Sequence, residues 1–162
     1  MKRRKFLALP LIAASGVLLT GCTGAPAGLF GRLVVLRHAD RTFSMLNDKG
    51  VARAATLPDA LADLQIDAIY TTPRPRNIAT ATPLAQARGL EVGNLLAAGA
   101  GTKLLRAHPG QTVVWVGNQE NLGLLYAELG VAAKPPVQYG EIHVVSFPEG
   151  GGQPALQKRL YG

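Results

Sequence analysis

The chain has 162 residues, and 48% of them are hydrophobic, which is enough for one ordinary core and leaves little room for a second domain. The formal net charge is +7, but four of the 17 basic residues lie in the first five positions, so that 13 basic and 10 acidic residues remain after this leader, a formal +3. This balance is too mild to indicate nucleic acid binding, and no basic run with interleaved aromatic residues follows. We therefore expect no nucleic acid partner.

The N-terminus has the pattern of a bacterial export signal. The basic start MKRRK precedes the apolar run FLALPLIAASGVLLT, and LTGC then places small residues before the only cysteine, Cys22. We predict a lipoprotein signal peptide over residues 1–21, of Sec or twin-arginine type, followed by lipidation of Cys22 and a small-residue tether over residues 22–30. A plain signal anchor with an incidental cysteine is the alternative.

This interpretation places the protein in the bacterial cell envelope, lipid-anchored to a membrane and facing the periplasm. Thr23 follows the cysteine, and the absence of aspartate there favours the outer membrane, by resemblance to known sorting rules. Because the only cysteine is committed to lipid, we expect neither a disulfide nor a thiolate metal cluster.

Residues 31–162 are predicted to form a single domain in which strands alternate with helices. The predicted strands cover residues 32–37, 66–72, 90–93, 112–117 and 141–147. The predicted helices cover residues 48–65 with a break at Pro58, 74–89 with a kink or split at Pro83 and an end at Gly89, 101–111, and 119–130. This alternation predicts a three-layer α/β/α sandwich with a mostly parallel sheet.

Polar side chains gather where three of the predicted strands end. The first strand runs into RHAD, the second into TTPRPR and the fourth into GNQEN. Because the carboxyl ends of parallel strands meet at one edge of a sheet, we expect these groups to share a crevice. Guanidinium groups and helix N-termini both favour phosphate, so the four side chains expected to surround a small anion are those of Arg37, His38, Arg76 and Asn118.

At these residues the sequence resembles the histidine phosphatase superfamily, also called phosphoglycerate mutase-like. LVVLRHAD is similar to the family's Arg-His-Gly motif with Ala39 in the glycine position, and LNDKGVARA to its Leu-Thr-x-x-Gly-x-x-Gln-Ala segment. IDAIYTTPRPRNIATATPLA resembles the segment with Ser-Ser-Pro, a following arginine and Thr-Ala, and VVWVGNQENL resembles Val-x-Val-Gly-His. The four motifs occur in the family's order, and the resemblance implies a phosphoglycerate mutase-like fold.

The resemblance also implies a mechanism without metal or other cofactor. His38 would attack a phosphoryl group and become a phosphohistidine, which water then hydrolyses, while Arg37 and Arg76 hold the phosphoryl oxygens. The family's second histidine is Asn118 here. An amide brings no charge to the developing phosphoryl anion, so turnover is expected to be weakened or lost, while anion binding survives.

The group that protonates the leaving group is less well defined. Asp40 follows the first motif directly and is a candidate catalytic residue, and Glu120 lies two residues beyond Asn118. Each has an alternative role, Asp40 as a loop cap and Glu120 as a first-turn residue favoured by the helix dipole. Arg41 is a candidate for binding substrate at the mouth of the crevice.

Two functions follow from these residues. One is an envelope-anchored phosphomonoester hydrolase acting on a phosphorylated small molecule or a phosphoprotein. The other is an inactive pseudoenzyme that binds phosphate, another anion or a partner. A binding domain unrelated to this family is a third possibility.

Overall fold

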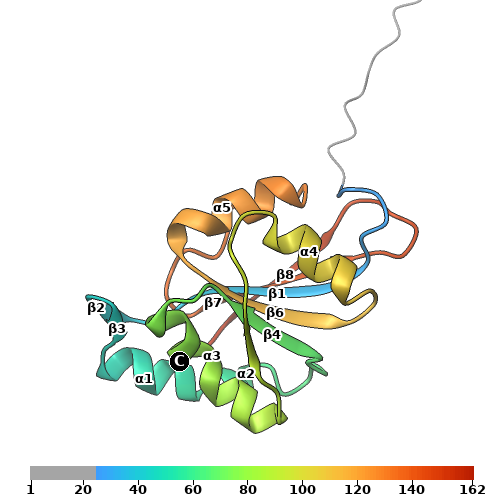
Figure 1. Ribbon diagram of the computed structural model, residues 1–162. Helices are drawn as coiled ribbons and strands as arrows, with labels where there is room; N and C mark the ends of the chain where they lie inside the picture. Colours follow the sequence, from blue (N-terminus) through green and yellow to red (C-terminus); the bar gives the residue numbers. More distant parts are fainter. Residues whose placement is uncertain (1–24) are drawn as a thin grey trace, which may run out of the picture.

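The computed structural model describes residues 25–162. The predicted signal peptide and Cys22 lie outside the described residues, as does the first part of the predicted tether. Six strands form one mixed sheet in the order β5-β4-β6-β1-β7-β8 (Figure 1). Their bounds are β1 Gly31–Arg37, β4 Ala68–Thr71, β5 Val92–Asn94, β6 Thr112–Gly117, β7 Glu141–Phe147 and β8 Ala155–Leu160. The first four strands of that order run parallel, and β7 and β8 each pair antiparallel with their neighbour.

Five helices cover the two faces of this sheet. Their bounds are α1 Asp48–Ala55, α2 Leu57–Ala60, α3 Pro75–Arg88, α4 Ala100–Ala107 and α5 Gln119–Glu128. Helices α1, α2 and α3 lie on one face, and α4 and α5 lie on the other (Figure 1). The predicted three-layer α/β/α sandwich with a mostly parallel sheet is confirmed.

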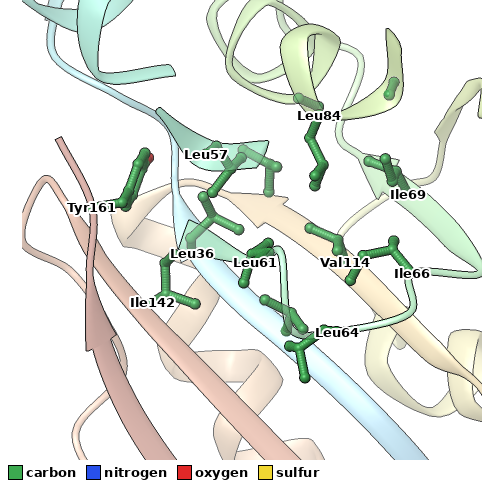
Figure 2. Packing of buried hydrophobic residues seen from close by; sticks show 14 of the residues in the cluster. Leu36, Leu57, Leu61, Leu64, Ile66, Ile69, Leu84, Val114, Ile142 and Tyr161 are labelled. Carbon is green, nitrogen blue, oxygen red and sulfur yellow. The ribbon is translucent and has the colours of Figure 1, made fainter. Parts of the chain in front are cut away.

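The central strands are buried on both sides, which is why they read as continuous apolar runs. All six residues of β6 are buried, and alternate residues of β1 face opposite layers. Figure 2 shows the layer under α2 and α3, where Leu57, Leu61 and Leu84 pack against Leu36 and Val114. These two apolar layers hold the central strands in place, and therefore also the loops that follow their carboxyl ends.

The prolines shape the first helical layer in different ways. The predicted helix over residues 48–65 is broken at Thr56, and Pro58 lies in the first turn of the short α2, as the prediction of a break requires. Pro83 lies inside α3 without splitting it, and α3 ends at Gly89 with a left-handed φ of 64°.

Two elements were not predicted from the sequence. One is the hairpin of β2 (Arg41–Thr42) and β3 (Met45–Leu46), which follows the first motif. The other is β8, which follows the strand predicted as the last, residues 141–147.

Among the helices of residues 25–162, none combines the length and the apolar sequence that crossing a membrane requires.

Candidate functional site

The residues of the predicted site lie at the carboxyl ends of β4, β6 and β1, which are neighbours in the sheet. His38 follows β1, Thr72 follows β4, and Asn118 follows β6 as the N-cap of α5. The His38 backbone N–H donates to the Gly117 carbonyl at 3.0 Å, so the chain leaving β1 stays bound to the end of β6. The structure thus brings the predicted strand ends together at one edge.

His38 is held in a single orientation. Its Nδ1 lies 2.8 Å from the Ala39 carbonyl oxygen, so Nδ1 carries the proton and donates it, which leaves the lone pair of Nε2 free. The side chain is 2% exposed. Burial, together with the nearby guanidinium charges of Arg76, Arg37 and Arg41, lowers the pKa of His38 to about 4 despite the opposing hydrogen bond to Ala39. A neutral imidazole with a free Nε2 is the form that can act as a nucleophile.

This environment predicts how the ring responds to pH. The pKa of His38 is about 4 in the folded protein, whereas the pKa of a histidine in an unfolded chain is about 6.5. The ring in the folded protein is therefore expected to stay neutral from pH 8 down to about 5. Below pH 6.5 the unfolded chain takes up this proton more readily, so the contribution of His38 to stability falls as the pH falls.

Ring chemical shifts measured by NMR across this range check the prediction, with the urea-unfolded protein as the reference. A protonation midpoint near 6.5 in the folded protein contradicts it.

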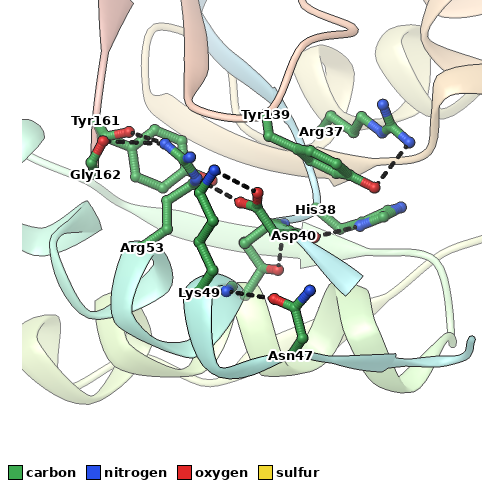
Figure 3. Close-up of polar contacts among 12 residues, drawn as sticks. Arg37, His38, Asp40, Asn47, Lys49, Arg53, Tyr139, Tyr161 and Gly162 are labelled. Carbon is green, nitrogen blue, oxygen red and sulfur yellow. Dashed lines mark hydrogen bonds and ion pairs between the residues drawn. The ribbon is translucent and has the colours of Figure 1, made fainter. Parts of the chain in front are cut away.

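Arg37 is fixed by the loop that precedes β7. Its Nη1 donates to the Val137 carbonyl at 2.8 Å and its Nη2 to the Tyr139 hydroxyl at 3.2 Å, and the guanidinium lies 4.2 Å above the Tyr139 ring. The same ring lies 5.8 Å from the ring of His38, and Figure 3 shows the three side chains together. The Arg37 Nε is buried and has no acceptor within the described part of the chain.

Arg76 approaches from the first turn of α3. Its Nη2 donates to the Asn118 side-chain oxygen at 3.0 Å, and its Nε is again buried without an acceptor among residues 25–162. A buried donor without an acceptor is costly, and two of them beside one neutral histidine require an explanation. An anion bound between the two guanidiniums would satisfy both.

Asn118 is fully buried and uses both ends of its amide. Its nitrogen donates to the Thr72 hydroxyl at 3.1 Å, while its oxygen accepts from Arg76. The amide therefore orients the guanidinium and presents its oxygen, not its N–H, on that side. Asn118 was predicted to be one of four side chains around a small anion, and in this arrangement a phosphoryl oxygen on the side of Arg76 would meet an acceptor.

Asp40, which was expected among the catalytic residues, is occupied elsewhere. It accepts from Arg53 Nε at 2.6 Å and lies 3.5 Å from Lys49 Nζ, and Arg53 also donates to the Tyr161 carbonyl (Figure 3). Although burial alone would raise the pKa of Asp40, the hydrogen bond and charge of Arg53 hold it below its usual range. A carboxylate paired in this way is a poor proton donor at neutral pH. The contacts therefore favour the alternative role of Asp40, as a residue that holds the loop after β1 against α1, over its predicted role as the acid.

Glu120 is no better placed as an acid. It is exposed and lies 2.8 Å from Arg74 at the rim of the crevice. A backbone hydrogen bond and the charges of Arg74 and Arg76 keep its pKa below the ordinary value. Arg41 was predicted to bind substrate at the mouth of the crevice. In the structure its Nη1 donates to the Phe43 carbonyl at 2.6 Å, and its charge lowers the pKa of both His38 and Arg76.

The smaller motif residues support the loop that carries His38. The Ala39 N–H donates to the Thr80 hydroxyl at 3.0 Å, and that hydroxyl donates in turn to the Arg76 carbonyl at 2.8 Å. Gly50 packs against the Asp40 backbone so closely that a Cβ would collide with it. The loop after β1 is thus fastened to both α1 and α3.

Two residues of the site were missed by sequence reasoning. Tyr139 lies in an irregular segment a hundred residues beyond His38, where no pattern marks it. Thr72 lies in a recognised motif but had no predicted role, although its hydroxyl accepts hydrogen bonds from both Asn118 and Asn77.

Within residues 25–162, no three His, Cys, Asp or Glu side chains lie close enough together to hold a metal ion.

Comparisons with known proteins agree with this geometry. Residues 35–95 match the model of the histidine phosphatase superfamily, branch 1. No curated protein sequence matches the chain. The resemblance recognised from the sequence is confirmed over residues 35–95 by this match, and the solved structures share the predicted fold.

Three of these solved structures illustrate the likeness. The protein histidine phosphatase SixA complexed with tungstate has a TM-score of 0.67 and 16% identity, over 80% of this chain and 96% of that chain. Bacillus stearothermophilus YhfR has a TM-score of 0.63 and 17% identity, over 80% and 96%. Mycobacterial glucosyl-3-phosphoglycerate phosphatase with inorganic phosphate has a TM-score of 0.57 and 19% identity, over 78% and 95%. Such low identities establish the fold alone.

Proposed function

We propose that this chain, with the fold of the histidine phosphatases and a segment that matches their family model, is an envelope-anchored phosphatase that works through a phosphohistidine on His38. The observation that carries the proposal is the pair of buried Nε groups of Arg37 and Arg76, which lack acceptors in the described residues and stand beside a neutral His38 with its Nε2 free. Tungstate and phosphate are the tetrahedral anions named in two of the similar structures, which supports an oxyanion here.

The reaction is a transfer in two steps. The Nε2 lone pair of His38 forms an N–P bond while the bond from phosphorus to the leaving group breaks, and the electron pair departs with that group. Arg37 and Arg76 stabilise the negative charge on the phosphoryl oxygens, as preorganised cationic donors do. Water then attacks phosphorus while the N–P bond breaks, and the electron pair of that bond returns to Nε2. The released phosphate keeps the protons of the water, so the imidazole is again neutral.

The leaving group has to depart without a carboxylic acid from Asp40 or Glu120, because both are ionised and paired with arginines. The site therefore suits leaving groups that need little help from an acid, such as aryl oxygens or the nitrogen of a phosphoramidate. Alkyl phosphate esters should react slowly. The substrate in this proposal is a phosphorylated small molecule or a phosphoprotein with such a leaving group.

The described chain begins at the end of the sheet opposite to His38, and this position is compatible with a lipid anchor at that end. The described chain enters the amino end of β1, and His38 lies at the other end of this seven-residue strand, about 20 Å away (Figure 1). A lipid on Cys22 joined through residues 22–30 would hold the amino ends of the strands toward the membrane. The crevice would then open into the periplasm, away from an outer or inner membrane.

A second candidate is a pseudoenzyme that binds phosphate, another anion or a partner without turnover. It is favoured by one observation, the neutral Asn118 amide whose oxygen faces Arg76. Such a site would hold an anion through its two arginines and give little stabilisation to the developing charge of a reaction.

Trapping the covalent intermediate separates the two candidates. We expect the wild-type protein, mixed with ³²P-labelled phosphoramidate and quenched in alkali, to carry acid-labile phosphate on His38, and the His38→Ala variant to carry none. The Asp40→Asn variant, which keeps a hydrogen-bonding partner for Arg53, should still be labelled. A wild-type protein that binds phosphate but takes up no label and hydrolyses no donor is the pseudoenzyme.

A further inference from the structure

A groove of about 500 Å³ adjoins the crevice on the side of α5. Thr72 and the Arg74–Glu120 ion pair form part of its lining, together with Leu96 and Leu124 from either side. Both features also contact residues of the proposed phosphoryl site. The Thr72 hydroxyl accepts a hydrogen bond from the Asn118 amide, and the charge of Arg74 lowers the pKa of Arg76. The groove therefore lies next to the residues proposed to hold the phosphoryl group, through Thr72 and Arg74.

The Thr72 hydroxyl can donate a hydrogen bond to a ligand in the groove. Its hydroxyl oxygen accepts from the Asn77 amide at 2.8 Å and from the Asn118 amide at 3.1 Å, which occupies both of its lone pairs. Its own hydrogen is then free for a bound ligand. The side chain is 6% exposed, so such a ligand would have to enter the groove to meet it.

The leucines of the groove are unusually open to solvent. Leu96 is 72% exposed and Leu124 is 71% exposed. The hairpin that follows His38 carries a second exposed pair, Phe43 and Met45, and Phe43 has a positive φ of 53°, which is strained for an aromatic residue. In residues 25–162 these four are the majority of the exposed large apolar side chains. Leu96 and Leu124 line the groove, and the hairpin is tied to the site through Arg41, which donates to the Phe43 carbonyl and whose charge lowers the pKa of His38.

We propose that the groove and the hairpin tip are a docking surface for a phosphorylated polypeptide, with apolar residues of the polypeptide on either side of its phosphoryl group. The inference rests on the proposed oxyanion site and specifies its substrate class. A small sugar phosphate offers hydroxyls and no apolar group that could cover Leu96 and Leu124. An extended chain can reach both apolar segments while its phosphorylated side chain enters between Arg37 and Arg76.

The test compares two short peptides that carry the same non-hydrolysable phosphonate analogue of a phosphorylated side chain, one flanked by leucines and one by glycines. The wild-type protein should bind the leucine peptide about tenfold more tightly, as burial of one or two leucine side chains implies. The variant Leu96→Ser/Leu124→Ser should lose this preference, and Leu160→Ser, which alters an exposed leucine outside the groove, should keep it.

Equal binding of the two peptides by the wild-type protein overturns the docking surface, as does a preference that survives in the groove variant. Capture of phospholipid vesicles through the same leucines, with no peptide preference, also overturns it. Titration with inorganic phosphate judges the anion site separately. A leucine preference without phosphate binding would refute the proposed function and with it the phosphorylated occupant, whereas phosphate binding without a leucine preference would overturn the docking surface alone.

Discussion

Replacing Asn118 by histidine is expected to raise the turnover number for a small aryl phosphate by about 10²- to 10³-fold, the size of effect that one well-placed donor has in other active sites. In the structure the Asn118 oxygen accepts from Arg76, so the present side chain adds no donor and no charge toward a phosphoryl group. An imidazole at this position can donate, and a bound dianion would favour its protonated form.

The substitution has to fit a fully buried position. A larger ring in a packed site can cost about 1–3 kcal/mol, so the free energy of unfolding is measured beside the kinetics. Asn118→Ala is the matched control, because it removes the amide that orients Arg76 and should lower phosphate affinity without raising turnover. A folded, phosphate-binding Asn118→His variant that is no faster than wild type would show that the remaining residues do not support the reaction.

The fold could be predicted largely from apolar runs. The strands around residues 32–37 and 112–117 are buried on both faces, and such strands have a continuous apolar signature that survives without an alignment. The hairpin strands β2 and β3 have two residues each, which is too short for any periodicity to appear. Strand β8 is mostly exposed at the edge of the sheet, and its sequence ALQKRL therefore carries little apolar pattern.

The site could be predicted where its residues follow strand ends. Arg37, His38 and Asn118 stand at or directly after buried strands, and Arg76 opens the next helix. Partners that come from distant loops could not be found in this way, as with Tyr139 at Arg37.

Asp40 illustrates a different limit of sequence reasoning. Its position beside the nucleophile is visible in the sequence, but its pairing with Arg53 depends on how α1 folds back under the loop. A carboxylate next to a nucleophile in sequence can therefore serve the fold instead of the reaction.

The second large effect is expected in anion binding. Removing one of two charge-assisted donors from a buried oxyanion site costs about 1.5–3 kcal/mol, which corresponds to a roughly 10- to 100-fold loss of affinity. Arg76→Gln should lose this much affinity for inorganic phosphate, because the Arg76 Nε, like the Arg37 Nε, is a buried donor left without an acceptor in the described residues. Arg74→Gln, which removes an equal charge at the exposed rim, should change affinity by less than about threefold.

Calorimetric titration of the wild-type protein, Arg76→Gln and Arg74→Gln with inorganic phosphate, at one fixed ionic strength, tests the oxyanion site most directly. The account predicts binding by the wild-type protein, a loss confined to Arg76→Gln, and a nearly unchanged Arg74→Gln. Absence of binding by the folded wild-type protein, or equal affinities in all three, would contradict it.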